Sequence, residues 1–496
     1  MQKILHLFFG AIILLASCSS GPGKGKEPKA DSTATKDTLP VAAKENFETG
    51  KVIDVITNLL DPAQTYALYL PSYYKTDKPL PVVYFFDAHA TGKLPVSKYK
   101  EIAETNGYIL IGSNNSKNGT SWEETQTIAA KLFSDSQGRI AINAKRIYLC
   151  GFSGGARVAN ALCISNGAIA GAICCGAASP AATSKDPRSN YTYLGICGTK
   201  DFNYVEMRKY DMVDLAGHAV KHAFVEFDGK HEWPDAETMK EGFLWMQLCS
   251  VRTGNAKISD ENHGDSLLAI SDQMLAKYSK LKKEGKAFEA YNQLKKTINF
   301  FDGIDNNSRP GAKIITAEHF KMFDELKKDP AIDKVQKQEE ATWKKEGDLQ
   351  KYYQEAFANN SLDWWRQEVA DLSKKSKGAD KSEAMMYART LDYLSLVAYM
   401  QTTGAMQQRD LPGSMMFSGI YLLVDPTNCE AHYIAAELAA TQHDRDKVMS
   451  ELKKAADNGF KEPERMEKDV VFGSLAKTDE FKTILNKVSE NASKEL

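Results

Sequence analysis

The chain has 496 residues, more than one hydrophobic core usually organises, so its length favours at least two domains. Its 63 lysines and arginines nearly balance its 65 aspartates and glutamates, which leaves a formal net charge of −2. This balance argues against nucleic acid as a partner and favours a small or neutral substrate.

The N-terminus has the features of a bacterial export signal. Lys3 precedes an apolar run over residues 4–16, which is too short for a membrane-spanning helix but has the length of a signal-peptide core. The run ends in Leu-Ala-Ser-Cys at residues 15–18, which resembles a bacterial lipobox. The resemblance implies cleavage after residues 1–17 and acylation of Cys18, which would anchor the protein to a membrane. We therefore expect a lipoprotein of the bacterial cell envelope, on its periplasmic or cell-surface face; an ordinary signal peptide with an incidental cysteine is the alternative.

Residues 18–45 are predicted to form a disordered tether, because they are rich in small and polar residues and carry almost no large apolar ones.

Beyond Cys18 the chain has seven cysteines, an odd number that leaves at least one thiol unpaired. Most of them lie in or beside apolar runs, where a cysteine is expected to be buried as a small hydrophobic residue. The sequence contains neither a CxxC nor an HExxH spacing, so we expect no metal site.

Residues 46–252 alternate short β-branched and aromatic runs with longer amphipathic ones. This alternation predicts a mainly parallel sheet covered by helices and opened by one or two meandering strands. The predicted strands are 51–56, 65–69, 81–86, 108–113, 146–150, 168–174, 192–197 and 223–227. The predicted helices are 97–106, 120–134, 155–164, 204–216 and 235–250.

The composition changes near Ser250 to one rich in Lys, Glu, Ala and Leu, which predicts a helical region over 253–380 and a helical domain over 381–496. After Asp425-Pro426, small residues recur at helical spacing in two successive segments. The unit resembles a tetratricopeptide repeat, whose neighbours would lie over 383–421 and whose surface would offer a site for a protein partner. A generic helical bundle is the alternative. The small residues of the two segments are Ala431, Ala435, Ala436, Ala439, Ala455 and Ala456.

The motif richest in chemistry is Gly-Phe-Ser-Gly-Gly at residues 151–155, between a predicted strand and a predicted helix. A serine on such a sharp turn projects its hydroxyl above the sheet, where a base and oxyanion donors can reach it. Gly151 and Gly155 fit because a side chain would collide at a turn this tight. The pattern predicts that Ser153 is a nucleophile.

The acid and the base are expected after the nucleophile, in that order. Asp201 follows the strand 192–197, and His231 follows the strand 223–227, so both are placed on the same sheet edge as Ser153. His231 would take the serine proton, and Asp201 would orient the imidazole. Asp228 is the alternative acid, although it lies only three residues before His231.

An oxyanion hole needs two amide donors, of which Gly154 is expected to supply one. The other would come from the loop after strand 81–86, from either Ala88 or His89. Three further residues are candidates for substrate binding. Trp122 and Trp233 would stack on a substrate ring, although Trp233 fits equally well as packing beneath His231, and Asn115 would either donate to substrate or shape its turn.

Three short patterns together resemble the esterase branch of the α/β-hydrolase superfamily, near polyhydroxybutyrate depolymerases and feruloyl or acetylxylan esterases. They are Gly-x-Ser-Gly-Gly at 151–155, Gly-Thr-x-Asp at 198–201 and His-x-Trp-Pro at 231–234. The resemblance covers 52–250 and implies an α/β-hydrolase domain that cleaves esters, among them polysaccharide-linked ones, without a cofactor. A serine peptidase and a catalytically silent scaffold that binds protein through its helices are the alternatives.

Overall fold

A single mixed sheet organises the first half of the protein. The computed structural model describes residues 44–178, 191–218, 220–256, 264–305 and 313–493, so Cys18 and nearly all of the predicted tether lie outside the described residues. The eight strands have the order β1-β2-β4-β3-β5-β6-β7-β8, with β1 and β2 antiparallel to their neighbours and the rest parallel. They are β1 Val52–Thr57, β2 Thr65–Tyr69, β3 Leu80–Phe86, β4 Ile109–Ser113, β5 Ile142–Phe152, β6 Gly171–Cys175, β7 Thr192–Gly198 and β8 Lys221–Phe227.

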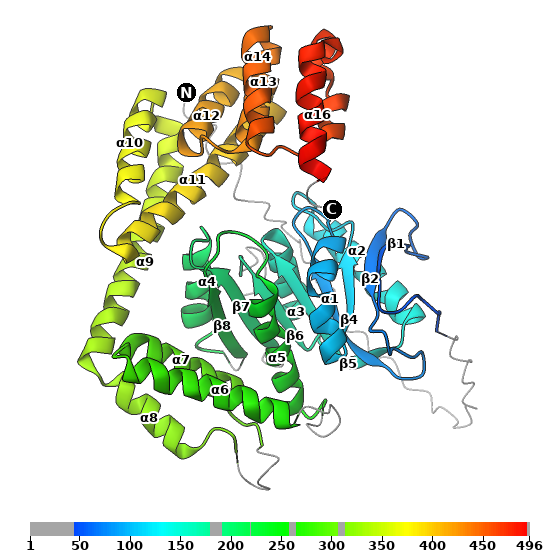
Figure 1. The fold of residues 1–496 in the computed structure, drawn as a ribbon, viewed down its shortest axis with the longest axis vertical. Coiled ribbons are helices and arrows are strands. Elements are labelled where there is room, and N and C mark those ends of the chain that lie inside the picture. Colours follow the sequence, from blue (N-terminus) through cyan, green and yellow to red (C-terminus); the bar gives the residue numbers. More distant parts are fainter. Residues whose placement is uncertain (1–43, 179–190, 219, 257–263, 306–312, 494–496) are drawn as a thin grey trace, which may run out of the picture. The chain divides into compact units, whose positions relative to one another are not determined.

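Helices cover both faces of this sheet (Figure 1). One face packs against α1 (Lys93–Asn106) and α5 (Ala236–Arg252). The other packs against α2 (Trp122–Arg139), α3 (Gly154–Ser165) and α4 (Tyr204–Lys209). Because both faces are buried, β3, β4, β6 and β7 are apolar along nearly their whole length, and β5 is apolar from Ile147 onward, as is typical of parallel strands between two helical layers.

The coarser part of the predicted fold class is confirmed: a mainly parallel sheet, opened by two antiparallel strands and covered by helices, is followed by a helical region. Several element boundaries differ from the predicted ones, and two of these differences have a clear structural reason. Strand β5 begins at Ile142 rather than Arg146, because Leu80 pairs with Ile142 across an irregularity in the β3–β5 ladder that periodicity does not reveal. The predicted helix 204–216 is an α-helix only to Lys209 and continues as a π-helix over Tyr210–Asp214.

Two helices beyond the predicted boundary contribute to the core of the sheet. Helices α6 (Gly264–Lys283) and α7 (Ala287–Phe301) follow α5, and their apolar side chains belong to the same buried cluster as α1 and α5. Leu294, Phe300 and Phe301 are fully buried there, and Phe300 contacts Trp245 of α5. The hydrophobic core on this face therefore continues past residue 252.

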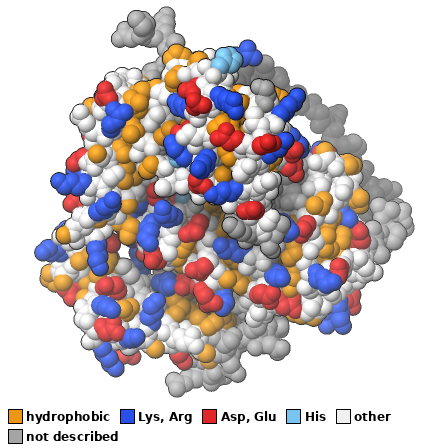
Figure 2. All heavy atoms as spheres, turned by 45° about the horizontal axis from the view of Figure 1, so that its top comes forward, with side chains coloured by type: hydrophobic (Ala, Val, Ile, Leu, Met, Phe, Trp, Pro, Cys, Tyr) orange, Lys and Arg blue, Asp and Glu red, His pale blue; other side chains and the backbone are white. Residues whose placement is uncertain are grey.

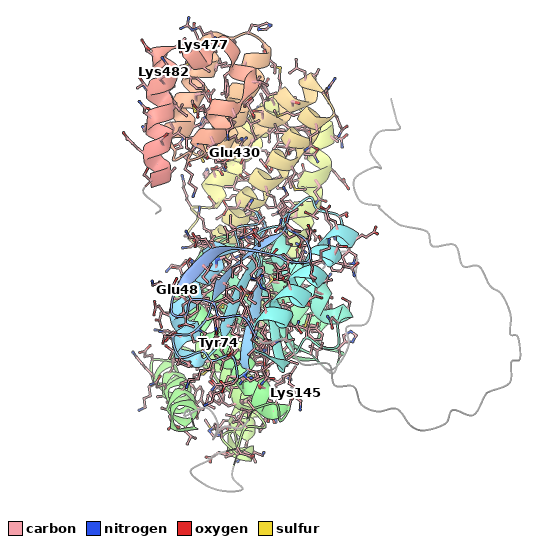
Figure 3. The ribbon with its side chains drawn as sticks, turned by 90° about the vertical axis from the view of Figure 1, so that its right-hand side faces the viewer. Glu48, Tyr74, Lys145, Glu430, Lys477 and Lys482 are labelled. Atoms are coloured by element: carbon pink, nitrogen blue, oxygen red, sulfur yellow. The ribbon has the colours of Figure 1, made fainter. Side chains whose placement is uncertain are left out.

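The remaining helices build two further apolar clusters. Helices α9 to α13 share one, and α13 to α16 share the other. Figure 3 labels Glu430, Lys477 and Lys482 in this region, and Glu48, Tyr74 and Lys145 in the α/β region. That 425–456 forms a tetratricopeptide repeat stays a prediction. The helices are α8 Ala317–Lys327, α9 Pro330–Asn359, α10 Leu362–Lys375, α11 Lys381–Gln407, α12 Leu411–Val424, α13 Cys429–Thr441, α14 Arg445–Asp457, α15 Pro463–Lys468, a 3-10 helix Val470–Lys477 and α16 Asp479–Ser493.

Side-chain caps fix where several of these helices begin. The Asp235 carboxylate accepts from the Thr238 amide at the start of α5, and Asp380 accepts from Glu383 at the start of α11. Asn428 accepts from two amides at the start of α13. Each cap satisfies a backbone N–H that has no partner within the helix, which contributes about 1 kcal/mol.

The surface mixes charges of both signs. On the face shown in Figure 2, acidic and basic side chains are interspersed with hydrophobic ones. Among the helices in the described parts of the chain, none combines the length and the apolar character that a membrane span needs.

The continuous core makes the predicted domain boundary testable. We expect a fragment of residues 44–254 to melt about 10 °C or more below a fragment of residues 44–328, because the shorter one loses the buried aromatic side chains of α7. Thermal unfolding followed by circular dichroism measures this difference. Equal melting temperatures would instead support an independent domain ending near Gly254.

Candidate active site

Ser153 occupies the sharp turn between β5 and α3. Its backbone has φ 54° and ψ −121°, outside the regions that a residue with a side chain normally adopts. The flanking glycines permit this turn. A Cβ on Gly151 would lie 2.1 Å from the Gly155 carbonyl oxygen, and one on Gly155 would lie 2.0 Å from the Phe86 carbonyl oxygen. The serine is therefore held where the strand ends, against the neighbouring strand β3.

A hydrogen-bonded chain joins Ser153, His231 and Asp201. His231 Nε2 lies 2.9 Å from Ser153 Oγ, and His231 Nδ1 lies 2.9 Å from both carboxylate oxygens of Asp201. An ionised carboxylate only accepts hydrogen bonds, so Nδ1–H donates to Asp201 and Nε2 is left to accept from the serine hydroxyl. This arrangement activates a hydroxyl by placing an acceptor on its proton.

Asp201 is held at the end of β7 by its own loop. Its side chain is 1% exposed, and its carboxylate also accepts from the Asn203 amide at 2.8 Å. Asp228, the other candidate acid, is 83% exposed and pairs with Lys200 at 2.7 Å. Of the two carboxylates, Asp201 is the one hydrogen-bonded to His231.

Residues that the sequence analysis did not single out enclose His231. The rings of Phe202 and Phe152 lie 4.2 and 4.7 Å from the imidazole, measured between ring centres. Gly176 lies beneath the pair, where a Cβ would approach Asp201 Oδ2 to 3.0 Å and His231 Nδ1 to 3.2 Å. The sequence signal for these residues was their position at strand ends, because the ends of parallel strands meet at one edge. Phe202 directly follows Asp201, Phe152 directly precedes Ser153, and Gly176 directly follows β6.

Asp87 organises the loop after β3. It is almost fully buried and accepts from the His89 amide at 2.8 Å, the Thr91 hydroxyl at 2.6 Å and the Trp233 indole N–H at 2.8 Å. The His89 amide is therefore engaged. Within the described residues, the Ala88 and Gly154 amides have no protein acceptor, so these two remain free to donate to a bound oxygen.

Two of the residues predicted to bind substrate have hydrogen-bond partners within the protein. Trp233 is buried, packs against Phe152 and donates to Asp87, which matches the packing alternative. Asn115 accepts from the Thr65 amide and donates to the Ala63 carbonyl, so both ends of its amide shape a turn.

Two other side chains remain candidates for contact with substrate. Trp122 is 37% exposed at the start of α2. Asn118, which the sequence analysis did not single out, lies against the elbow, since a Cβ on Gly154 would lie 1.8 Å from its Oδ1. The backbone N–H of Asn118 also donates to the Ala88 carbonyl, which links Asn118 to the candidate oxyanion loop.

Cysteines near the elbow are unsuited to act as nucleophiles. Burial raises the pKa of the thiols of Cys174, Cys175 and Cys197, and the Asp201 carboxylate raises the pKa of Cys197 further. A neutral thiol is a poor nucleophile, so Ser153 is the group to consider. In the described part of the chain, no group of three or more His, Cys, Asp or Glu side chains is arranged to hold a metal ion.

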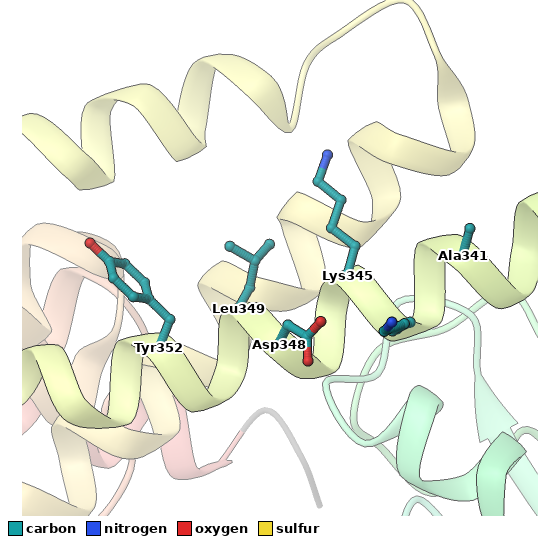
Figure 4. Close-up of a pocket in the computed structure, with 6 residues that line it drawn as sticks. Ala341, Lys345, Asp348, Leu349 and Tyr352 are labelled. Atoms are coloured by element: carbon teal, nitrogen blue, oxygen red, sulfur yellow. The ribbon is translucent and has the colours of Figure 1, made fainter.

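A separate groove of about 460 Å³ lies on α9 (Figure 4). It offers no nucleophile hydrogen-bonded to a base, so we assign the candidate active site to the Ser153 elbow. The groove is lined by Ala341, Lys344, Lys345, Asp348, Leu349 and Tyr352.

Comparisons with known proteins give only distant similarities. The sequence matches no family model and no curated protein. Solved structures similar to part of the chain include a hyperthermophilic esterase from the archaeon Pyrobaculum calidifontis, at 14% identity over 41% of this chain and 85% of that one, with a TM-score of 0.33. A fluorophosphonate-binding serine hydrolase of Staphylococcus aureus matches at 17% sequence identity over 40% of this chain and 99% of that one, with a TM-score of 0.33. A feruloyl esterase module from Clostridium thermocellum matches at 13% sequence identity over 42% of this chain and 91% of that one, with a TM-score of 0.31. Similarity this weak leaves function to be argued from the chain's own residues.

Proposed function

We propose that this protein is a serine hydrolase of the α/β-hydrolase type that cleaves carboxylic esters. The observation that carries the proposal is the hydrogen-bonded chain from Asp201 through His231 to Ser153, with the serine on a strained turn at the end of a parallel strand. Ester substrates outside the cytoplasm are the class to test first, with polysaccharide-linked esters among them.

The chemistry follows from where each proton can go. His231 Nε2 takes the hydroxyl proton as Ser153 Oγ attacks the ester carbonyl, and the imidazolium then protonates the departing alcohol. Asp201 stabilises the imidazolium and fixes the ring tautomer. Water, activated by the same His231, attacks the acyl-serine, and the acid product leaves. The reaction needs no cofactor.

Charge that develops on the carbonyl oxygen needs preorganised donors. We assign the amides of Gly154 and Ala88 to this role, because both lack a protein acceptor in the described residues while the His89 amide is engaged by Asp87. Removal of one such donor typically costs about 10²- to 10³-fold in kcat.

The nucleophile is tested by covalent labelling. We expect a fluorophosphonate to label Ser153 in the intact protein and Ser153→Ala to lose both the label and about 10⁶-fold in turnover of a p-nitrophenyl ester, because the acyl group then has no acceptor. Mass spectrometry of the labelled peptide identifies the site.

Labelling that persists in Ser153→Ala would exclude this nucleophile. A matched anilide separates ester hydrolysis from peptidase activity. An intact protein that neither reacts nor hydrolyses either substrate would support a silent scaffold.

The two candidate acids give a paired test. Asp201→Asn is expected to lower kcat by about 10⁴-fold, because an amide reverses the hydrogen-bond demand on His231. Asp228→Asn is the matched control and should leave kcat within about twofold, since Asp228 is exposed at the surface, where it pairs with Lys200. Steady-state kinetics on one aryl ester compares them. A larger loss in the Asp228 variant would reverse the assignment.

We also propose that acylated Cys18 anchors the protein to a membrane of the bacterial cell envelope. The proposal rests on the lipobox-like Leu-Ala-Ser-Cys at 15–18 and the polar tether after it. Cys18→Ala should move the protein from the membrane to the soluble fraction, because two or three acyl chains supply the anchoring free energy. Fractionation without detergent measures this, and unchanged membrane association would contradict the anchor.

A further inference from the structure

Side chains of the helical region hydrogen-bond the backbone on either side of Asp201. Arg389 Nη1 of α11 donates to the Thr199 carbonyl at 2.9 Å, and Gln350 Nε2 of α9 donates to the Phe202 carbonyl at 3.3 Å. Thr199 precedes Asp201 by two residues, and Phe202 follows it directly. The loop that carries the candidate acid is thus held from outside the α/β region at both of its ends.

Arg389 is held rigidly for this contact. Its Nε donates to Glu346 Oε1 at 2.9 Å and its Nη2 to Glu346 Oε2 at 2.5 Å, a two-pronged pair that joins α11 to α9. Both side chains are buried, and the guanidinium lies 4.6 Å from the ring centre of Tyr204. A planar guanidinium fixed at two of its nitrogens points the third in one direction, here toward the Thr199 carbonyl.

The other side of the same loop is held by the strand that leads to His231. The Thr199 amide donates to Phe227 O and the Lys200 amide to Gly229 O, each at 2.9 Å. Movement of the loop is therefore restrained by β8 on one side and by α9 and α11 on the other. The spacing between Asp201 and His231 is therefore fixed, because the loop that carries Asp201 is bonded both to β8 and to the helices.

Helix α11 also runs close to the acid and base themselves. Asp392 lies one turn beyond Arg389, so both are on the same side of the helix. The pKa of Asp392 is raised, chiefly by burial. The charges of Asp425 and Asp201 also raise it, whereas Lys230 and His231 lower it. The charges of the candidate acid and base therefore act on Asp392, on the same side of α11 as Arg389.

We propose that the Arg389–Glu346 pair is a positioning device for the candidate active site: through Thr199, it holds Asp201 in hydrogen-bonding geometry with His231. The inference rests on the proposed hydrolase function and assigns the helical region a part in it. Arg389 is a positioning residue, because it acts through the loop and does not touch the reacting groups.

The test replaces the pair by apolar residues of similar size in the full-length protein. Arg389→Met combined with Glu346→Leu removes the donor to Thr199 without leaving an uncompensated buried charge. We expect kcat for an aryl ester to fall by about 10- to 100-fold with KM within about twofold, since misplacement of the acid affects the transition state more than substrate binding.

A matched control separates positioning from general stability. His432 and Glu451 form another buried pair between two helices, α13 and α14. His432→Leu combined with Glu451→Met should lower the melting temperature, because it also removes the hydrogen bond to the Pro426 carbonyl and the ion pair with Lys454, but should leave kcat within about twofold. Equal losses of kcat in the two double variants, in proportion to their losses of stability, would overturn the proposal. So would an unchanged kcat in the Arg389 and Glu346 variant.

A second, milder variant covers the case in which that double variant does not fold. Gln350 is half-buried, and Gln350→Leu removes only the hydrogen bond to the Phe202 carbonyl. It should lower kcat by about two- to tenfold with KM unchanged. A soluble Gln350→Leu protein with the intact kcat would then count against positioning from the helical region.

A spectroscopic signature distinguishes failure of this inference from failure of the proposed function. The His231 Nδ1 proton, bonded to Asp201, should give a low-field NMR resonance, identified by its loss in His231→Gln. The signal does not depend on turnover. An upfield shift in the Arg389 and Glu346 variant supports positioning even if the intact protein hydrolyses no ester. An unmoved signal overturns positioning even if the intact protein is a good esterase.

Discussion

A buried carboxylate is the constraint on which this structure depends. Asp201 is almost fully removed from water, and an ionised group in that position costs several kcal/mol unless hydrogen bonds replace its hydration. His231 and the Asn203 amide supply those bonds. The loop must therefore stay in register with the strand that carries His231, and backbone bonds from β8 and side chains of α9 and α11 keep it there.

The elbow imposes a second requirement, which is close approach of backbone to backbone. The first turn of α3 lies so near the end of β3 that even a methyl group on Gly155 would collide with the Phe86 carbonyl. The same strand end leads into Asp87, which binds the loop above it to Trp233 in the segment after His231. Ser153, the candidate oxyanion loop and the segment that carries His231 are thereby linked through the end of β3.

The helical half of the chain has two relations to the sheet. Helices α6 and α7 are part of its hydrophobic core, so they contribute to stability through apolar burial. Helices α9 and α11 contact the loop around Asp201 through polar and charged groups, which orient the loop more than they stabilise the fold. Helices α13 to α16 build a cluster of their own, and the predicted repeat-like surface for a protein partner belongs to them.

Much of this was readable in the sequence, because local patterns report local structure. Alternating apolar runs determined the strands and their order along the chain, and Gly-Phe-Ser-Gly-Gly placed the turn at Ser153, since no other residue type than glycine fits so tight an approach. Asp201 and His231 followed from their positions after strands, because parallel strands bring such ends to one edge. Only the tertiary structure distinguished the backbone amides of Ala88 and His89, because the Asp87 carboxylate accepts a hydrogen bond from the His89 amide. Only it showed Arg389 beside Thr199, since residues 190 positions apart in sequence leave no periodic signal of their contact.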